Sequence, residues 1–188
     1  MPRVLDAEER NRLVSEAAWR VLVRDGIQAL SVRRIAAEAG LPPSSLRYTF
    51  PTQSSVRIGA YEMVAERLMA RVAAISPDDD RWARLVLLEL LPLDAQRRLE
   101  MEVCLAFGTA AMTDPELRHT FRSVHRDERA LCERVVRSVR VAAADVPVEA
   151  ERLHALVDGL ALHLVRQDPE EDTGWAVRVL DAHLARLG

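Results

Sequence analysis

The chain has 188 residues, of which 49% are hydrophobic, and its formal net charge is −3. This hydrophobic fraction excludes a disordered chain, and the lack of any uncharged apolar run of about 18 residues excludes a membrane-spanning helix. The N-terminus has no signal-peptide pattern, and the spacing of Cys104 and Cys132 fits neither a disulfide framework nor a zinc site. We therefore expect a soluble, cytoplasmic protein with no metal ion and no cofactor.

The charges are distributed unevenly along the chain. Residues 1–60 hold nine arginines and six acidic residues, whereas residues 61–188 hold seventeen arginines and twenty-three acidic residues. A slightly basic head on an acidic body indicates that only the head approaches phosphate.

Helix start and stop signals divide the first forty residues. Apolar residues at helical spacing predict a helix over residues 8–25, and Gly26 is expected to end it in a left-handed conformation. Ser31 can cap a second helix, and Gly40 is expected to end that one.

Residues 31–50 have the pattern of a helix-turn-helix, in which a tight turn joins two short helices. The second short helix is expected to begin at Pro43, because proline suits the first position of a helix, and to run to about Thr49. The core that the two helices share is expected to consist of Ile35, Leu41, Leu46 and Phe50.

The outward side chains of this motif suit the major groove of DNA. Arg47 can bind the O6 and N7 atoms of a guanine together through its planar guanidinium. Tyr48 offers a hydroxyl to phosphate, and Arg33 stands at the start of the first short helix, where the helix dipole favours an anion. The motif therefore predicts DNA contacts by Ser31, Arg33, Pro43, Ser44, Ser45, Arg47, Tyr48 and Thr49.

The rest of the chain reads as a series of amphipathic helices. A long one is expected from Gln53 to about Ile75, followed by a hinge at Ser76-Pro77. No alternating strand pattern competes, so the predicted fold class is all-α, with about nine helices. The later helices are expected over residues 79–91, 94–111, 115–143, 149–167 and 171–187, with breaks at prolines and aspartates.

The run from Leu13 to Val56 resembles the DNA-binding head of the tetracycline-repressor (TetR) family of transcriptional regulators. The matching elements are Ala-Ala at 17–18, Gly26, S-V-x-x-I-A-x-x-A-G-L at 31–41 and L-x-x-x-F at 46–50. Later segments resemble the ligand-binding region of the subgroup that includes the choline-responsive betaine-operon repressor. These segments are ELLPLDAQRR at 89–98, EVCLAF at 102–107 and DPELR at 114–118.

The resemblance implies a three-helix helix-turn-helix head over residues 1–52. It implies a helical ligand-binding and dimerisation body over residues 53–188, with residues 53–75 as the connecting helix. Three positions depart from the family pattern: members usually have an aromatic residue at Arg47, a Ser or Thr cap at Pro42 and a phosphate-binding lysine at Gln53. We count Gln53 among the DNA contacts and expect weaker binding with a flatter salt dependence.

The body is expected to enclose a ligand pocket lined mainly by apolar side chains with a few polar groups. Each candidate residue also fits an ordinary position in the hydrophobic core. His154 and Asp158 share a helix face at i, i+4, which is more simply a hydrogen bond than a metal or acid–base pair. The candidates are Trp82, Met101, Cys104, Leu105, Phe107, Met112, Phe121, His125, His154 and Asp158.

A homodimer is expected because one short helix reads only a few base pairs, so two half-sites one helical turn apart are needed for useful specificity. The last two helices carry broad apolar stripes, and the resemblance implies that they form a four-helix interface with their mates. The stripe residues are Leu153, Leu156, Val157, Leu160, Leu164, Val179, Leu180, His183, Leu184 and Leu187.

The predicted function is that of a homodimeric repressor, released from a palindromic double-stranded operator by an unknown small molecule. Two alternatives stay open. One is a helical interaction module that does not bind DNA. The other is a small helical enzyme, although no nucleophile elbow, H-E-x-x-H or phosphate-binding loop is present and no catalytic residue is predicted.

Overall fold

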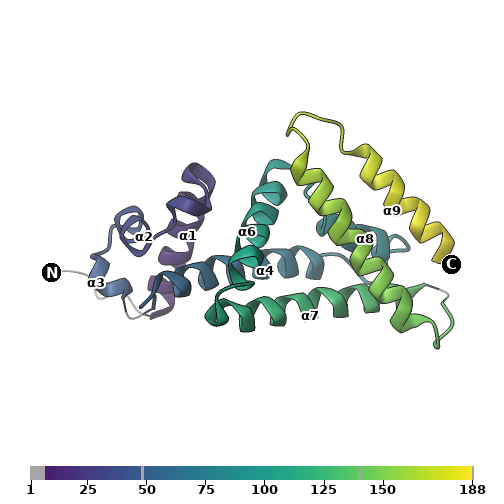
Figure 1. Cartoon of the computed structure of the whole chain (residues 1–188), viewed down its shortest axis with the longest axis horizontal. Helices are drawn as coiled ribbons and strands as arrows, with labels where there is room; N and C mark the ends of the chain where they lie inside the picture. Colours follow the sequence, from purple (N-terminus) through teal and green to yellow (C-terminus); the bar gives the residue numbers. More distant parts are fainter. Residues whose placement is uncertain (1–6, 48, 140, 188) are drawn as a thin grey trace. The chain divides into compact units, whose positions relative to one another are not determined.

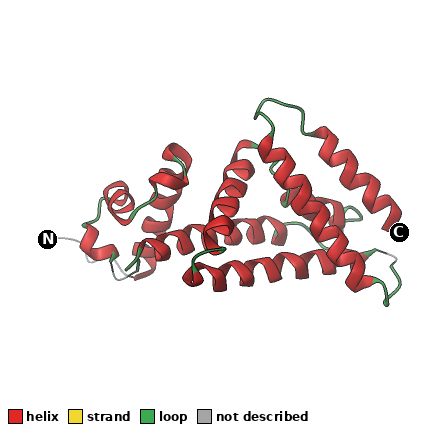
Figure 2. Ribbon diagram, viewed as in Figure 1, coloured by secondary structure: helices red, strands yellow, loops and turns green. Residues whose placement is uncertain are grey.

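The structure is a computed structural model that describes residues 7–47, 49–139 and 141–187. All regular structure in these residues is helical (Figure 2), which confirms the all-α prediction. The helical elements, most of which Figure 1 labels, follow one another along the chain. They are α1 (Ala7–Asp25), the 3-10 helix η1 (Ile27–Ala29), α2 (Val32–Ala39), α3 (Pro43–Leu46), α4 (Gln53–Ala73), α5 (Trp82–Glu89), α6 (Ala95–Ala111), α7 (Pro115–Ser138), α8 (Val146–Arg166) and α9 (Gly174–Leu187).

The chain divides into two compact units. The first unit holds the chain up to Val64 together with Val103–Thr120, and the second holds Ala65–Glu102 and the chain from Phe121 onward. The helices α4, α6 and α7 therefore each contribute residues to both units. The predicted division of function at residue 52 stays a prediction.

The ends of α2 form as the sequence predicts. Ser31 is extended, with φ −154°, and its side-chain oxygen accepts a hydrogen bond from the backbone N–H of Arg34. Gly40 is left-handed, with φ 66° and ψ 28°, and the next residue, Leu41, donates its N–H to the carbonyl of Ala36 at 2.9 Å. This pair of features is a Schellman ending, and it turns the chain sharply toward α3.

Replacing Ser31 with alanine should lower the free energy of unfolding by about 1 kcal/mol, because the amide of Arg34 loses its capping acceptor. Urea denaturation followed by far-UV circular dichroism measures the change. Ser44→Ala is the matched control, since Ser44 is exposed on α3 and caps nothing among the described residues. Equal losses in the two variants would contradict the role of the cap.

Two local predictions about the head are wrong. Gly26 has the expected positive φ of 76°, but its ψ of 173° is extended, because the chain leaves α1 for η1 and not for a left-handed cap. The recognition helix α3 ends at Leu46 and not near Thr49. Arg47 is its C-terminal cap, and the N–H of Phe50 closes the following turn on the carbonyl of Leu46 at 2.7 Å.

Each unit has its own core. In the first unit α1 packs on α2, and the ring of Tyr61 on α4 stacks on Phe107 of α6 with centroids 4.2 Å apart. In the second unit α5 and α8 each pack against α9. No helix in the described ranges is both long and apolar enough to cross a membrane.

Candidate nucleic-acid interface

The turn between α2 and α3 is held by a small apolar core. Ile35, Ala36 and Leu46 are each at most 1% exposed, so α3 is fixed on α2 by its single inward leucine. Two further predicted core residues, Leu41 and Phe50, are half-buried. This packing leaves one face of α3 to solvent and gives its side chains a defined direction.

The predicted contact residues on this face are not equivalent. Pro43, Ser44 and Thr49 are exposed, whereas Ser45 is half-buried and donates its hydroxyl to the carbonyl of Pro42 at 2.7 Å. The hydroxyl of Ser44 is therefore better placed for a base edge than that of Ser45. Tyr48 lies outside the described residues, so its predicted contact stays a prediction.

Arg33 and Arg47 border the same open groove. Both are exposed, and within the described part of the chain neither has an ion pair. The groove has a volume of 730 Å³ and also runs past Pro43, Thr52 and Gln53. Two unneutralised cations beside an exposed short helix give this surface a positive potential, which suits a polyanion.

The other arginines near α2 are neutralised within the head. Arg20 and Arg24 reach Glu38 at 2.8 and 2.9 Å, and Arg34 reaches Asp25 at 3.0 Å. The hydrogen bond from Arg20 is the largest effect that lowers the pKa of Glu38, and the bond from Arg24 does the same for Asp25. Neighbouring residues 33 and 34 thus differ sharply in their availability to DNA.

Gln53 is engaged within the first unit. Its side-chain Nε2 donates to the carbonyl of Leu30 at 2.9 Å, which ties the start of α4 to the segment between η1 and α2. Thr52 and Ser55 cap α4 reciprocally: each side-chain oxygen accepts the other residue's backbone N–H, at 3.0 and 3.1 Å. At the position where family members have a phosphate-binding lysine, this chain therefore has a glutamine that forms a hydrogen bond within the first unit.

The start of α7 is also linked to the start of α4. The hydroxyl of Ser54 donates to Asp114 at 3.1 Å, and that of Thr52 donates to Glu116 at 3.3 Å. Asp114 in addition accepts the backbone N–H of Glu116 at 3.0 Å. Both acids belong to the DPELR segment of the sequence, so part of this segment holds the base of α4 in place.

The predicted pocket residues do not gather around one cavity. Trp82 belongs to the core of the second unit, Phe107 is stacked on Tyr61, and Met112 is 76% exposed. Met101, Cys104 and Leu105 are half-buried on α6. The remaining four form a cluster of their own, which is Phe121, His125, His154 and Asp158.

A cavity of 370 Å³ lies in the first unit, bordered by η1, α4 and α6. Of the predicted pocket residues only Phe107 borders it. The other residues that line the cavity were not predicted as pocket residues. Their place on its wall depends on how three helices meet, and no sequence pattern indicates that. The lining residues are Ile27, Gln28, Gln53, Arg57, Val103, Ala106, Phe107, Thr109, Ala110 and Thr113.

Half of the predicted dimer residues are buried in their own chain. The sequence pattern shows that these positions are apolar, but α8 and α9 use them to build the second unit's core. They are Leu153, Val157, Leu160, Leu164 and Leu180, all at most 5% exposed. Leu156, His183, Leu184 and Leu187 are half-buried, and Val179 is 42% exposed.

The geometry defines a class of protein. A helix-turn-helix with a solvent-facing second helix, flanked by two arginines that have no ion pair within the described ranges, is the arrangement of a DNA-binding regulator. The chain matches the model of bacterial regulatory proteins of the tetR family over residues 15–55 and the model of the BetI-type transcriptional repressor C-terminal region over residues 79–188.

The HTH-type transcriptional regulator PksA of Bacillus subtilis is 33% identical to this chain, covering 100% of the chain and 94% of PksA. A transcriptional regulator of Rhodococcus sp. Rha1 has a similar crystal structure, with TM-score 0.78, 25% identity and 94% of both chains covered. The multidrug binding protein EbrR complexed with imidazole is 29% identical, with TM-score 0.67, covering 98% of this chain and 94% of EbrR. The chain therefore belongs to the tetR family and is a DNA-binding transcriptional regulator.

Proposed function

We propose that this regulator is a homodimeric repressor that a small molecule releases from a palindromic operator. The observation that carries the proposal is the pair Arg33 and Arg47, which border one groove beside α3 and have no ion pair with any residue that the structure describes. Arg47 binds a base through its guanidinium, and Arg33 binds a phosphate. A regulator that binds DNA acts where the DNA is, so we place this repressor in the cytoplasm.

Two copies of the chain are needed to bind the operator. A four-residue recognition helix contacts too few bases for useful specificity, and a two-fold dimer repeats the contact one helical turn away. Since the buried leucines of α8 are unavailable, the partner contacts the opposite side of that helix, where Ala155 and the half-buried Leu162 lie, and the exposed Val179 of α9.

The first unit's cavity is the proposed effector site. Its 370 Å³ is within the range of small-molecule pockets, and it combines apolar walls with polar groups from Gln53 and Thr109. EbrR, a relative of this chain, is a multidrug binding protein, which supports a small-molecule effector. An effector in this cavity touches Gln53, whose amide holds Leu30, and thereby reaches the head directly.

The first experiment is a fluorescence-anisotropy titration of the protein against its own upstream intergenic DNA and against a scrambled duplex, near physiological salt. The repressor proposal expects tight binding to the native duplex alone, with two protomers for each site. Equally weak binding to both duplexes would contradict an operator within the upstream intergenic DNA. No binding at low salt would favour the helical interaction module.

Filling the cavity should mimic the effector. Ala106→Phe places a ring in the space beside Phe107, and we expect the operator affinity to fall by about 5- to 150-fold, the usual size of coupling between two sites. Anisotropy measures the affinity, and thermal unfolding checks that the variant stays folded. Ala70→Phe, at an exposed position of α4, is the control. A folded Ala106→Phe variant with unchanged affinity would overturn the effector site.

A further inference from the structure

Three metal-ligating side chains meet in the second unit. His125 comes from α7, and His154 and Asp158 stand one turn apart on α8. One ligand atom from each residue lies within 4.8 Å of the others. The Nε2 atom of His154 is 3.8 Å from Asp158 Oδ2, and the two imidazole centroids are 4.6 Å apart.

His154 is the fixed member of this cluster. Its side chain is only 7% exposed, and its buried Nε2 atom has no hydrogen-bond partner among the residues that the structure describes. A buried polar atom without a partner is costly, because it has lost its hydrogen bonds to water, so a group that satisfies Nε2 is favoured there.

The surroundings also favour a cation. Asp158 is 58% exposed and has no arginine partner among the described residues. Arg129 of α7 is already bonded to Glu151 of α8. The carboxylate of Asp158 therefore stays available to a cation.

We propose that His125, His154 and Asp158 bind a first-row divalent metal ion, with Zn²⁺ as the reference ion. Two imidazoles and one carboxylate suit Zn²⁺ and its neighbours, whereas Mg²⁺ and Ca²⁺ prefer oxygen ligands alone. A tetrahedral ion at about 2.1 Å from each ligand needs the ligand atoms roughly 3.4 Å apart, so atoms that lie within 4.8 Å of one another must close by up to about 1.4 Å. The exposed His125 and Asp158 can supply this by changing rotamers.

Three protein ligands leave one coordination position open, which a water or a small anionic or neutral donor fills. The ion would join α7 to α8 across the unit and would satisfy the orphaned Nε2 of His154. This site is independent of the proposed repressor function, because none of its residues borders the groove or the cavity.

The test uses the full chain, free of any affinity tag and stripped of metal with a chelator. Calorimetric titration with Zn²⁺ should give one ion for each chain, and Co²⁺ should give the visible spectrum of a four-coordinate nitrogen and oxygen site. His125→Ala and Asp158→Asn, both at exposed positions, should each weaken binding at least tenfold and abolish the rise in melting temperature that Zn²⁺ causes.

His119→Ala and His163→Ala are the matched controls, since both histidines are exposed and lie outside the cluster. They should bind Zn²⁺ as the unmodified chain does. The proposal is overturned if the unmodified chain binds no Zn²⁺, if the two cluster variants bind it unchanged, or if a control variant loses it. His154→Gln, checked for folding by circular dichroism, should also lose the ion.

Discussion

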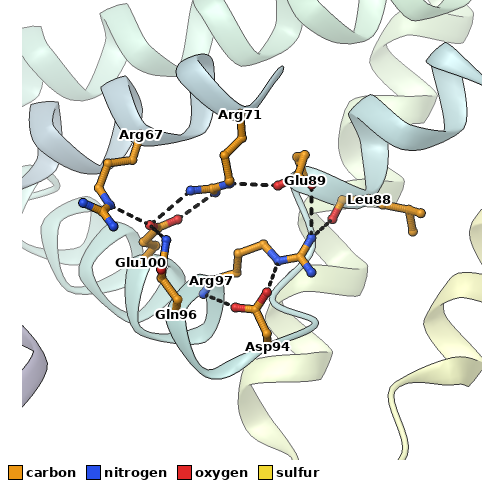
Figure 3. Close-up of polar contacts among 8 residues, drawn as sticks. All are labelled: Arg67, Arg71, Leu88, Glu89, Asp94, Gln96, Arg97 and Glu100. Atoms are coloured by element: carbon orange, nitrogen blue, oxygen red, sulfur yellow. Dashed lines mark hydrogen bonds and ion pairs between the residues drawn. The ribbon is translucent and has the colours of Figure 1, made fainter. Parts of the chain in front are cut away.

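Replacing Glu100 with alanine should lower the free energy of unfolding by about 3 kcal/mol, at the lower end of the cost of breaking a buried ion pair. Its carboxylate is 5% exposed and accepts hydrogen bonds from Arg67 and Arg71 of α4 at 2.8–3.2 Å and from Gln96 at 3.2 Å (Figure 3). Without it, two cations lose their shared counterion. The arginines are 35% and 27% exposed, so water recovers part of the loss.

The cluster around Glu100 extends to α5, which adds to its expected effect. Burial alone would lower the pKa of Arg71, but its bonds to Glu100 and Glu89 raise that pKa above the ordinary value. Arg97 in turn bonds Asp94 at 2.8 Å and the carbonyl of Leu88 at 2.9 Å (Figure 3). Ion pairs thus hold the C-terminal half of α4 to α5 and α6 within the second unit.

Urea denaturation of Glu100→Ala, Glu100→Gln and Glu102→Ala separates charge from helix propensity. Glu102 lies on the same helix, is 49% exposed and meets Arg98 at 3.6 Å, so its loss should cost less than about 1 kcal/mol. Glu100→Gln keeps the shape and should fall between the other two. If Glu100→Ala and Glu102→Ala unfold alike, the buried pairing contributes nothing measurable.

The head was predictable because its signals are local. Ser31 caps α2, Gly40 ends it and Pro43 begins α3, each through backbone chemistry that involves only a few neighbouring residues. The length of α3 was not predictable in this way. Pro51 ends the helical pattern only after Phe50. The chain leaves the helix already at Leu46 and seats Phe50 against α4, where the ring lies 2.9 Å from the position of a β-carbon on Gly59.

The helices of the body were predictable from the sequence, but the contacts that its residues make with one another were not. Apolar spacing identifies Leu153 and Leu160 as members of a buried face, yet it does not distinguish a core within the chain from a partner's surface. One local pattern does indicate a buried ion pair: Glu100 shares a helical face with Val103 and Phe107, which are both buried. The approach of His125 to His154 depends on how α7 and α8 meet, which no local pattern encodes.

Arg47→Ala should weaken operator binding by about 1–3 kcal/mol for each half-site, and binding should become less selective at the base pair that Arg47 contacts. The reason is that Arg47 is exposed beside α3 and, in the described part of the chain, has no ion pair to be broken first. Anisotropy titrations against the operator and against single-base variants of it measure both effects. A uniform loss over all sequences would assign Arg47 to phosphate and not to a base.

Arg33 and Arg34 give the sharpest comparison, because they are adjacent and chemically identical but differ in their partners. Arg33→Ala should weaken binding to all sequences and lower the slope of log affinity against log salt by about one for each protomer. Arg34→Ala should leave the slope unchanged, since Asp25 already holds that guanidinium at 3.0 Å. If both variants lower the slope equally, DNA draws Arg34 away from Asp25, and the ion pairs of the free head do not decide which arginines reach phosphate.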